Sequence, residues 1–232
     1  AREAQERKKE KRSNFLYATI AVVFVLVAAA AIIYRTNVIP RMVTAATIDG
    51  GNYSAAEVSF YYQNAYQNIQ QNAYYLGLET STPLQNQTIT EDAASMISAL
   101  GLGEAEEGQT WHEFVLNTAL TQMAQIQAAL AAAEAEGFTY PEGMQVQYDD
   151  SMTSLKAAAQ ASGLSVNQYL ANAFGTSLIT ESLYGEQLMR MLQYEAYANS
   201  YFNGLSYDTA TLEETYEADP NSYDKVSYES VS

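Results

Sequence analysis

The sequence contains no cysteine and only one histidine among its 232 residues. Without cysteine, the chain has no disulfide bond, thiolate metal site, cysteine nucleophile or lipid-modified N-terminal cysteine. The one histidine, His112, has no second histidine and no acidic cluster at ligand spacing beside it, so neither a metal site nor a catalytic triad is supported. We interpret His112 as an ordinary polar residue in the first turn of a helix.

Other motifs that carry chemistry are also missing. The chain has no calcium loop of the Asp-x-Asp-x-Asp-Gly type, no glycine-rich phosphate loop and no Gly-x-Ser-x-Gly elbow. Adjacent acidic residues occur, for example Glu106-Glu107 and Asp149-Asp150, but adjacent carboxylates point apart and do not face each other across a cleft. The sequence therefore predicts no catalytic residue, no cofactor and no metal.

Basic residues are scarce outside the N-terminal segment. Residues 1–12 hold six of the eleven lysines and arginines, whereas the chain from Met42 onward has three basic and twenty-four acidic residues, a net charge of −21. A surface this negative repels phosphate backbones, so nucleic acid is not an expected partner. The same charge favours solubility and weakens contact with anionic lipid.

One long stretch, residues 15–34, lacks charge altogether and is mostly aliphatic. As a helix rising about 1.5 Å per residue, it spans roughly 30 Å, which is the thickness of the hydrocarbon core of a bilayer. Tyr17 and Tyr34 suit the two interfaces, and the basic residues before the segment outweigh those after it. These features predict a single-pass protein of the cell membrane, with residues 1–14 as a cytoplasmic tail, residues 15–34 in the lipid bilayer and the main domain extracytoplasmic.

A cleaved signal peptide is the alternative for this segment, because Val43-Thr44-Ala45 offers small residues for a cleavage site. The apolar run is longer than is usual for a signal peptide, and a long polar stretch precedes it, so we favour the anchor. Residues 35–44 then form a linker. A disulfide-free domain outside a membrane also favours a bacterium that does not rely on oxidative folding.

After the linker, the same sequence signal for the start of a helix occurs three times. Three capping boxes, in which a hydroxyl residue stands three positions before Glu or Gln, begin at Ser54, Thr110 and Ser165. Apolar residues recur behind them at helical spacing, and glycines follow the expected ends. The predicted elements are a short strand at 45–49 with a turn at Gly50-Gly51, helices at 54–76, 91–100, 110–137, 141–162, 165–174, 177–201 and 208–218, and a strand at 223–232.

These elements predict an all-α fold. The helices are of unequal length, which indicates an irregular multi-helix domain at residues 45–218 with a short N-terminal strand. Residues 219–232 are expected to begin a further domain. Polar and apolar residues alternate near their end, which indicates a strand, and no later strand in the sequence could pair with it. The sequence leaves the oligomeric state open.

Tyrosine is abundant, with nineteen residues, and seven methionines accompany it. Tyrosine joins an apolar ring to a polar tip and methionine adapts its shape, so surfaces rich in both suit contact with varied partners. For any single tyrosine, the simpler interpretation is that its ring fills the helical core. The candidate residues for binding an unfolded polypeptide client are Tyr61, Tyr62, Tyr66, Trp111, Phe114, Met123, Tyr184, Met191, Tyr194, Tyr197 and Tyr201.

Three stretches carry a family pattern: Ala46-Thr47-Ile48-Asp49-Gly50 with Tyr53-Ser54-Ala55-Ala56-Glu57-Val58 and Tyr61-Tyr62, then Thr110-Trp111-His112-Glu113-Phe114 with the Ala- and Leu-rich helix up to Gly137, then Leu212-Glu213-Glu214-Thr215-Tyr216-Glu217 with Tyr223-Asp224-Lys225-Val226. Placed in this order behind a membrane helix, they resemble the SurA/PrsA-type extracytoplasmic foldases over residues 45–228. The chain departs from that family by lacking the lipobox cysteine and the residues of the isomerase domain.

The resemblance implies a SurA N-terminal-like chaperone domain that cradles unfolded secreted polypeptides, with a parvulin-like isomerase domain immediately downstream. Our leading hypothesis is therefore a membrane-tethered chaperone domain whose partners are unfolded or secreted polypeptides. Two alternatives remain. One is a peptidyl-prolyl cis-trans isomerase whose catalytic domain lies beyond residue 232, and the other is a non-enzymatic adaptor of the cell envelope.

We predict that residues 15–34 stay attached to the mature protein as its membrane anchor. N-terminal sequencing of the membrane-extracted protein should therefore recover the basic residues that precede Phe15. A mature N-terminus directly after Ala45 would contradict the anchor and identify a cleaved signal peptide.

Overall fold

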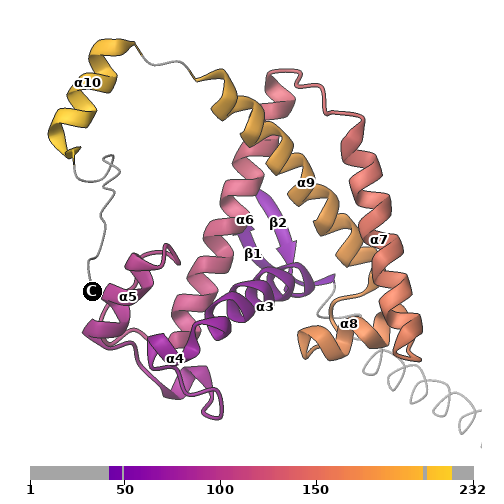
Figure 1. The fold of residues 1–232 in the computed structure, drawn as a ribbon. Coiled ribbons are helices and arrows are strands. Elements are labelled where there is room, and N and C mark those ends of the chain that lie inside the picture. The colour runs from indigo at the N-terminus through magenta and orange to yellow at the C-terminus, as the bar shows by residue number, and fades with distance from the viewer. Residues whose placement is uncertain (1–41, 49, 206–207, 221–232) are drawn as a thin grey trace, which may run out of the picture.

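The computed structural model describes residues 42–48, 50–205 and 208–220. Within them the chain is mainly helical and carries one two-stranded hairpin, which confirms the predicted helical character (Figure 1). In chain order the elements are β1 (Thr44–Ile48), β2 (Gly51–Ser54), α3 (Ala55–Gln71), α4 (Ala73–Leu76), the 3₁₀ helix η1 (Leu84–Asn86), α5 (Glu91–Ala99), α6 (Trp111–Ala135), α7 (Gly143–Ala161), α8 (Val166–Phe174), α9 (Glu181–Gly204) and α10 (Thr209–Ala218).

Several predicted segments lie outside the described residues. These are the basic tail at 1–14, the membrane segment at 15–34, most of the linker at 35–44 and the strand at 223–232. Among the residues that the structure does describe, no helix combines the length and the apolar character needed to cross a bilayer.

The predicted N-terminal strand is one half of a hairpin. β1 pairs antiparallel with β2, with Ile48 opposite Gly51 and Thr44 opposite Ser54, and Gly50 takes a positive φ of 78° at the turn. β2 was not predicted, because it has four residues and its last one is already the N-cap of α3. The hairpin therefore leads directly into the first helix.

All three predicted capping boxes form. At the start of α3, the Ser54 hydroxyl accepts a hydrogen bond from the Glu57 amide, and the Glu57 carboxylate accepts one from the Ser54 amide at 2.7 Å. The same reciprocal pair of bonds begins α6 and α8. Each box satisfies amides that have no partner inside the helix, which fixes where these helices begin.

Several helix boundaries differ from the prediction; α9, for example, begins at Glu181 instead of near residue 177. The first helix breaks at Asn72, whose backbone leaves the helical region, so α4 is a separate turn closed by Gly77 at a φ of 64°. Pro141 precedes α7 instead of opening it, and the helix begins at Gly143 after Glu142, which makes no side-chain cap hydrogen bond. The break at Asn72 and the start of α7 occur where no capping side chain marks the boundary.

The core lies where α3 packs across α6 (Figure 1). The apolar stripe predicted along α6 is buried, and Val115 and Ala119 are fully excluded from solvent. From α3, Phe60 and Ile69 close the other side. Each large apolar side chain buried here stabilises the fold by roughly 1.5–3 kcal/mol. The segment between α4 and α5 also reaches this core, because Ile89 is buried and its amide donates to the Gln109 carbonyl.

α7 and α9 run antiparallel on the far side of α6 from α5 (Figure 1). Gly185, in the interior of α9, faces α7 so closely that a Cβ there would lie 2.7 Å from the Tyr148 hydroxyl. Glycine costs a helix interior about 1 kcal/mol relative to alanine, so its presence has a packing reason here. The bare backbone of α9 leaves room for the Tyr148 side chain.

We predict a pH-dependent contribution from the capping box of α6. Hydrogen bonds from the Thr110 amide and hydroxyl hold the pKa of Glu113 below its ordinary value of 4.5. The stabilisation by the Glu113 carboxylate is therefore complete above that value and is lost as the pH falls through the lower, folded-state pKa. Glu113→Gln keeps the capping geometry but does not titrate.

Urea titrations of both proteins between about pH 6 and pH 3 should show the wild type losing free energy of unfolding relative to E113Q on the acid side. Glu107→Gln, in the exposed loop before α6, controls for the loss of one negative charge. Parallel pH curves for wild type and E113Q would contradict the prediction.

Candidate functional site

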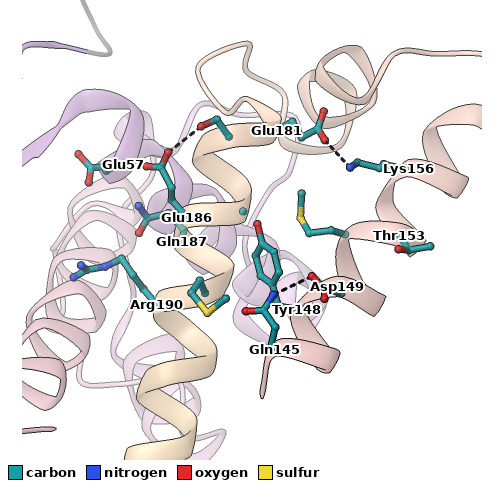
Figure 2. Close-up of a pocket in the computed structure, with 14 residues that line it drawn as sticks. Glu57, Gln145, Tyr148, Asp149, Thr153, Lys156, Glu181, Glu186, Gln187 and Arg190 are labelled. Atoms are coloured by element: carbon teal, nitrogen blue, oxygen red, sulfur yellow. Dashed lines mark hydrogen bonds and ion pairs between the residues drawn. The ribbon is translucent and has the colours of Figure 1, made fainter. Parts of the chain in front are cut away.

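A groove of about 1230 Å³ runs between α7 and α9 and reaches the first turn of α3 (Figure 2). One wall is α7 from Gln145 to Lys156, and the other is α9 from Glu181 to Arg190. Glu57 of α3 closes one end. Three segments that are distant in sequence thus build the groove. α9 lines the groove with some of its side chains and packs against the core with others.

The groove has an apolar portion at its centre. Gly185 lets the Tyr148 side chain lie against α9, and the Met152 methyl comes within 3.5 Å of the position a Cβ would take at Gly185. Met189, one turn further along α9, lines the same space. Methionine is flexible and polarizable, so this portion can adapt to apolar side chains of different shape.

Carboxylates dominate the rim of the groove. Asp149 accepts a hydrogen bond from Gln145, and Glu186 accepts one from Ser182, at 3.0 and 2.9 Å (Figure 2). Glu181 forms an exposed ion pair with Lys156 at 3.3 Å. Asp149 and Glu186 thus make ordinary surface hydrogen bonds, and Lys156 is paired with Glu181.

The positive charges of the described residues are concentrated in this groove. Lys156 and Arg190 are the two lysine or arginine residues within residues 42–48, 50–205 and 208–220, and both line it. Four carboxylates also line the groove, those of Glu57, Asp149, Glu181 and Glu186, so its net charge is negative.

A buried polar network lies behind the groove. Gln187 is 2% exposed, and its Oε1 accepts a hydrogen bond from the Tyr61 hydroxyl at 2.9 Å. Gln127 Oε1 accepts from the Tyr53 hydroxyl at 2.8 Å and from Arg190 Nη2 at 2.9 Å. The network ties β2, α3 and α6 to α9, and so fixes the rotation of the helix that forms one wall.

Burial raises the pKa of the Tyr61 hydroxyl, and the charge of the neighbouring Arg190 acts in the opposite direction. Tyr61 is therefore a neutral hydrogen-bond donor at physiological pH. Arg190 Nε is buried and has no hydrogen-bond partner within the described part of the chain. The guanidinium is held on the core side of α9 by Gln127.

Five of the predicted client-binding residues are buried in the structure. Tyr61, Trp111, Phe114, Met123 and Tyr197 are at most 8% exposed and belong to the packed interior. Large aromatic side chains gain most from leaving water, which is why they lie in the core and not on an open surface. Their side chains therefore lie inside the fold in this structure.

The other six predicted residues do not form one surface. Tyr62, Tyr66, Met191 and Tyr194 are half-buried around the core, and Tyr184 packs edge-on against Phe60. Tyr201 is exposed near the end of α9. The sequence reasoning missed the groove, because its residues are mostly polar and match no motif. Gly185 inside a long predicted helix was the one signal of a close helix–helix approach.

The structure places His112 on the surface, as expected. Its Nδ1 lies 2.8 Å from the Tyr62 hydroxyl, and the two rings are in contact. No group of three or more His, Asp or Glu side chains in the described part of the chain is arranged to hold a metal ion. Comparison with known proteins finds no match among family models, curated proteins or solved structures.

We predict that the buried network is more sensitive to Tyr61 than to Tyr53. Tyr61→Phe leaves the buried carbonyl of Gln187 without this donor and should cost about 1–3 kcal/mol in free energy of unfolding. In Tyr53→Phe, Gln127 keeps the hydrogen bond from Arg190, so the loss should be below about 1 kcal/mol. Urea titration of both variants checks the ranking, and an equal or reversed loss would contradict it.

Proposed function

We propose that the chain is a membrane-tethered, extracytoplasmic chaperone domain that binds unfolded secreted polypeptides in the groove between α7 and α9. The observation that carries the proposal is the groove itself, whose centre is apolar and adaptable and whose rim is polar. An unfolded segment presents the same mixture, with apolar side chains spaced along a polar backbone.

The size of the groove supports a polypeptide client. Its volume of about 1230 Å³ is larger than the 300–1,000 Å³ or so typical of small-molecule pockets. Gln145 on its wall offers an amide to a peptide backbone, while Met152 and Met189 offer adaptable apolar contact.

Exposed aromatic residues add weaker contact sites. Tyr74 and Tyr75 are 91% and 70% exposed on α4 and pack edge-on against each other. Tyr201 and Phe202 form a similar exposed pair near the end of α9. Such scattered rings suit transient binding of different segments of one client, in which no single contact is tight.

The tether and the family likeness are further parts of the proposal. The tether depends on residues 15–34, and the likeness to SurA/PrsA-type foldases on the order of the sequence motifs. The net charge of −21 from Met42 onward would hold the domain away from an anionic bilayer, with its groove open to clients. Isomerase activity would require a domain outside this sequence.

We predict that blocking the groove abolishes client binding. Because the chain has no cysteine, a single Thr153→Cys substitution gives one reactive thiol, at an exposed position that lines the groove. Coupling a bulky maleimide there should remove most of the ability of the full-length protein to suppress aggregation of a denatured client, followed by light scattering.

The neighbouring Ser154→Cys is the matched control, since Ser154 is exposed on α7 but does not line the groove. Labelled S154C should keep its activity, and circular dichroism should show both labelled proteins folded. Equal activity of the two labelled variants would overturn the groove as the binding site. Failure of the unlabelled wild type to suppress aggregation at several-fold excess would overturn the chaperone function.

A further inference from the structure

We infer that the groove selects polypeptide segments in which a lysine or arginine is flanked by apolar side chains. The inference rests on the proposed function and names the class of segment bound. It is carried by the groove's two kinds of surface: carboxylates at one end that lack a cation, and an adaptable apolar portion next to them on α9.

The carboxylates of Glu57 and Glu186 lie side by side at one end of the groove (Figure 2). A second hollow, of about 260 Å³, opens at the same place and is lined by both residues and by Leu178 and Leu183. The two hollows thus share a negatively charged entrance with apolar side chains behind it.

Neither of these carboxylates is neutralised by the described residues. The Lys156 ammonium is engaged with Glu181, and the Arg190 guanidinium turns toward Gln127 on the core side of α9. No ion pair to Glu57 or Glu186 is formed in the described part of the chain. A cation supplied by the client is therefore the complement of this end of the groove.

Hydroxyl groups hold the two carboxylates in place. Ser54 donates to Glu57 Oε2 from both its amide and its hydroxyl, at 2.7 and 2.8 Å, and Ser182 donates to Glu186 Oε1 at 2.9 Å. In each carboxylate these bonds occupy one oxygen. The other oxygen accepts no hydrogen bond from the described residues, so it is available to an ammonium or guanidinium donor.

On α9, the acidic residue Glu186 lies close to the apolar residue Met189. Glu186 and Met189 are three positions apart on one helix face, which separates their Cβ atoms by about 5–6 Å. Residues of an extended polypeptide are about 3.3 Å apart and their side chains alternate in direction, so two side chains that are two positions apart share a face and match this separation. A basic side chain at Glu186 therefore places an apolar side chain two positions away at Met189 and Met152.

The charge preference should be modest. Exposed ion pairs are weak, so two carboxylates predict a preference of only about fivefold for a lysine-containing segment over its neutral counterpart. The preference should weaken as salt screens the charges. Apolar contact in the groove supplies the remaining affinity.

The test uses the full-length protein in a nanodisc of neutral lipid and three short fluorescent peptides that differ at one central position. The position is lysine, glutamine or glutamate, with leucine and phenylalanine on both sides. We expect binding in the order lysine, glutamine, glutamate, with about fivefold between the first two at low salt. Glu57→Gln with Glu186→Gln should reduce binding of the lysine peptide to the level of the glutamine peptide.

Both substitutions preserve the local hydrogen bonds, since glutamine also serves at the third position of a capping box and can accept from Ser182. Should the double variant fail to fold, Glu186→Gln alone is expected to reduce the fivefold preference for the lysine peptide to about twofold, because each carboxylate contributes about half of the free energy. Glu106→Gln with Glu107→Gln removes the same charge from an exposed loop outside the groove, and should change affinity less than about twofold.

The possible failures are distinguishable. Equal binding of the three peptides, or an equal loss in the groove and loop variants, overturns the charge selection while client binding stands. Absence of binding to any peptide, together with no suppression of aggregation, overturns the proposed function as well. A gain in affinity when the basic residues of segment 1–12 are replaced by glutamine would identify that segment as the occupant and overturn the inference.

Discussion

The fold depends on how α9 is held from the core side. The Tyr61 hydroxyl binds the buried Gln187, and Arg190 and Tyr53 share the half-buried carbonyl of Gln127, so three elements fix one helix through polar contacts. A buried carbonyl without its donor costs about 1–3 kcal/mol, which makes any other rotation of α9 unfavourable. That rotation decides which side chains α9 presents to α7. The groove is therefore a product of polar contacts in the interior as much as of the helices that border it.

Much of the helical layout could be predicted from the sequence, because local chemistry sets it. The capping boxes that begin at Ser54, Thr110 and Ser165 locate three helix starts, since the side chains that satisfy the free amides lie within four residues of one another. β2 and the break at Asn72 could not be predicted in this way. Both depend on how the hairpin and α4 pack against the rest of the chain, and no local side chain marks them.

The site was much harder to predict than the helices. The abundance of tyrosine suggested an aromatic surface, but Trp111 and Phe114 lie in the core, where their large apolar area is most favourable. A sequence shows which residues share a helix face, but not which face remains open once several helices pack. The groove arises from the antiparallel approach of α7 to α9, and Gly185 was its single sequence signal. The proposed tether depends on residues 15–34, which lie outside the described residues.

The confinement of Lys156 and Arg190 to one groove has a practical consequence. Trypsin cleaves after lysine and arginine, so within the described residues its two target bonds both follow groove residues. Amine-reactive reagents likewise meet a single lysine side chain there, Lys156. A client lying along α7 and α9 would cover both positions. Because the Arg190 side chain is held by Gln127 whereas the Lys156 side chain is exposed, amine labelling of Lys156 gives a native footprint of groove occupancy, with no engineered probe required.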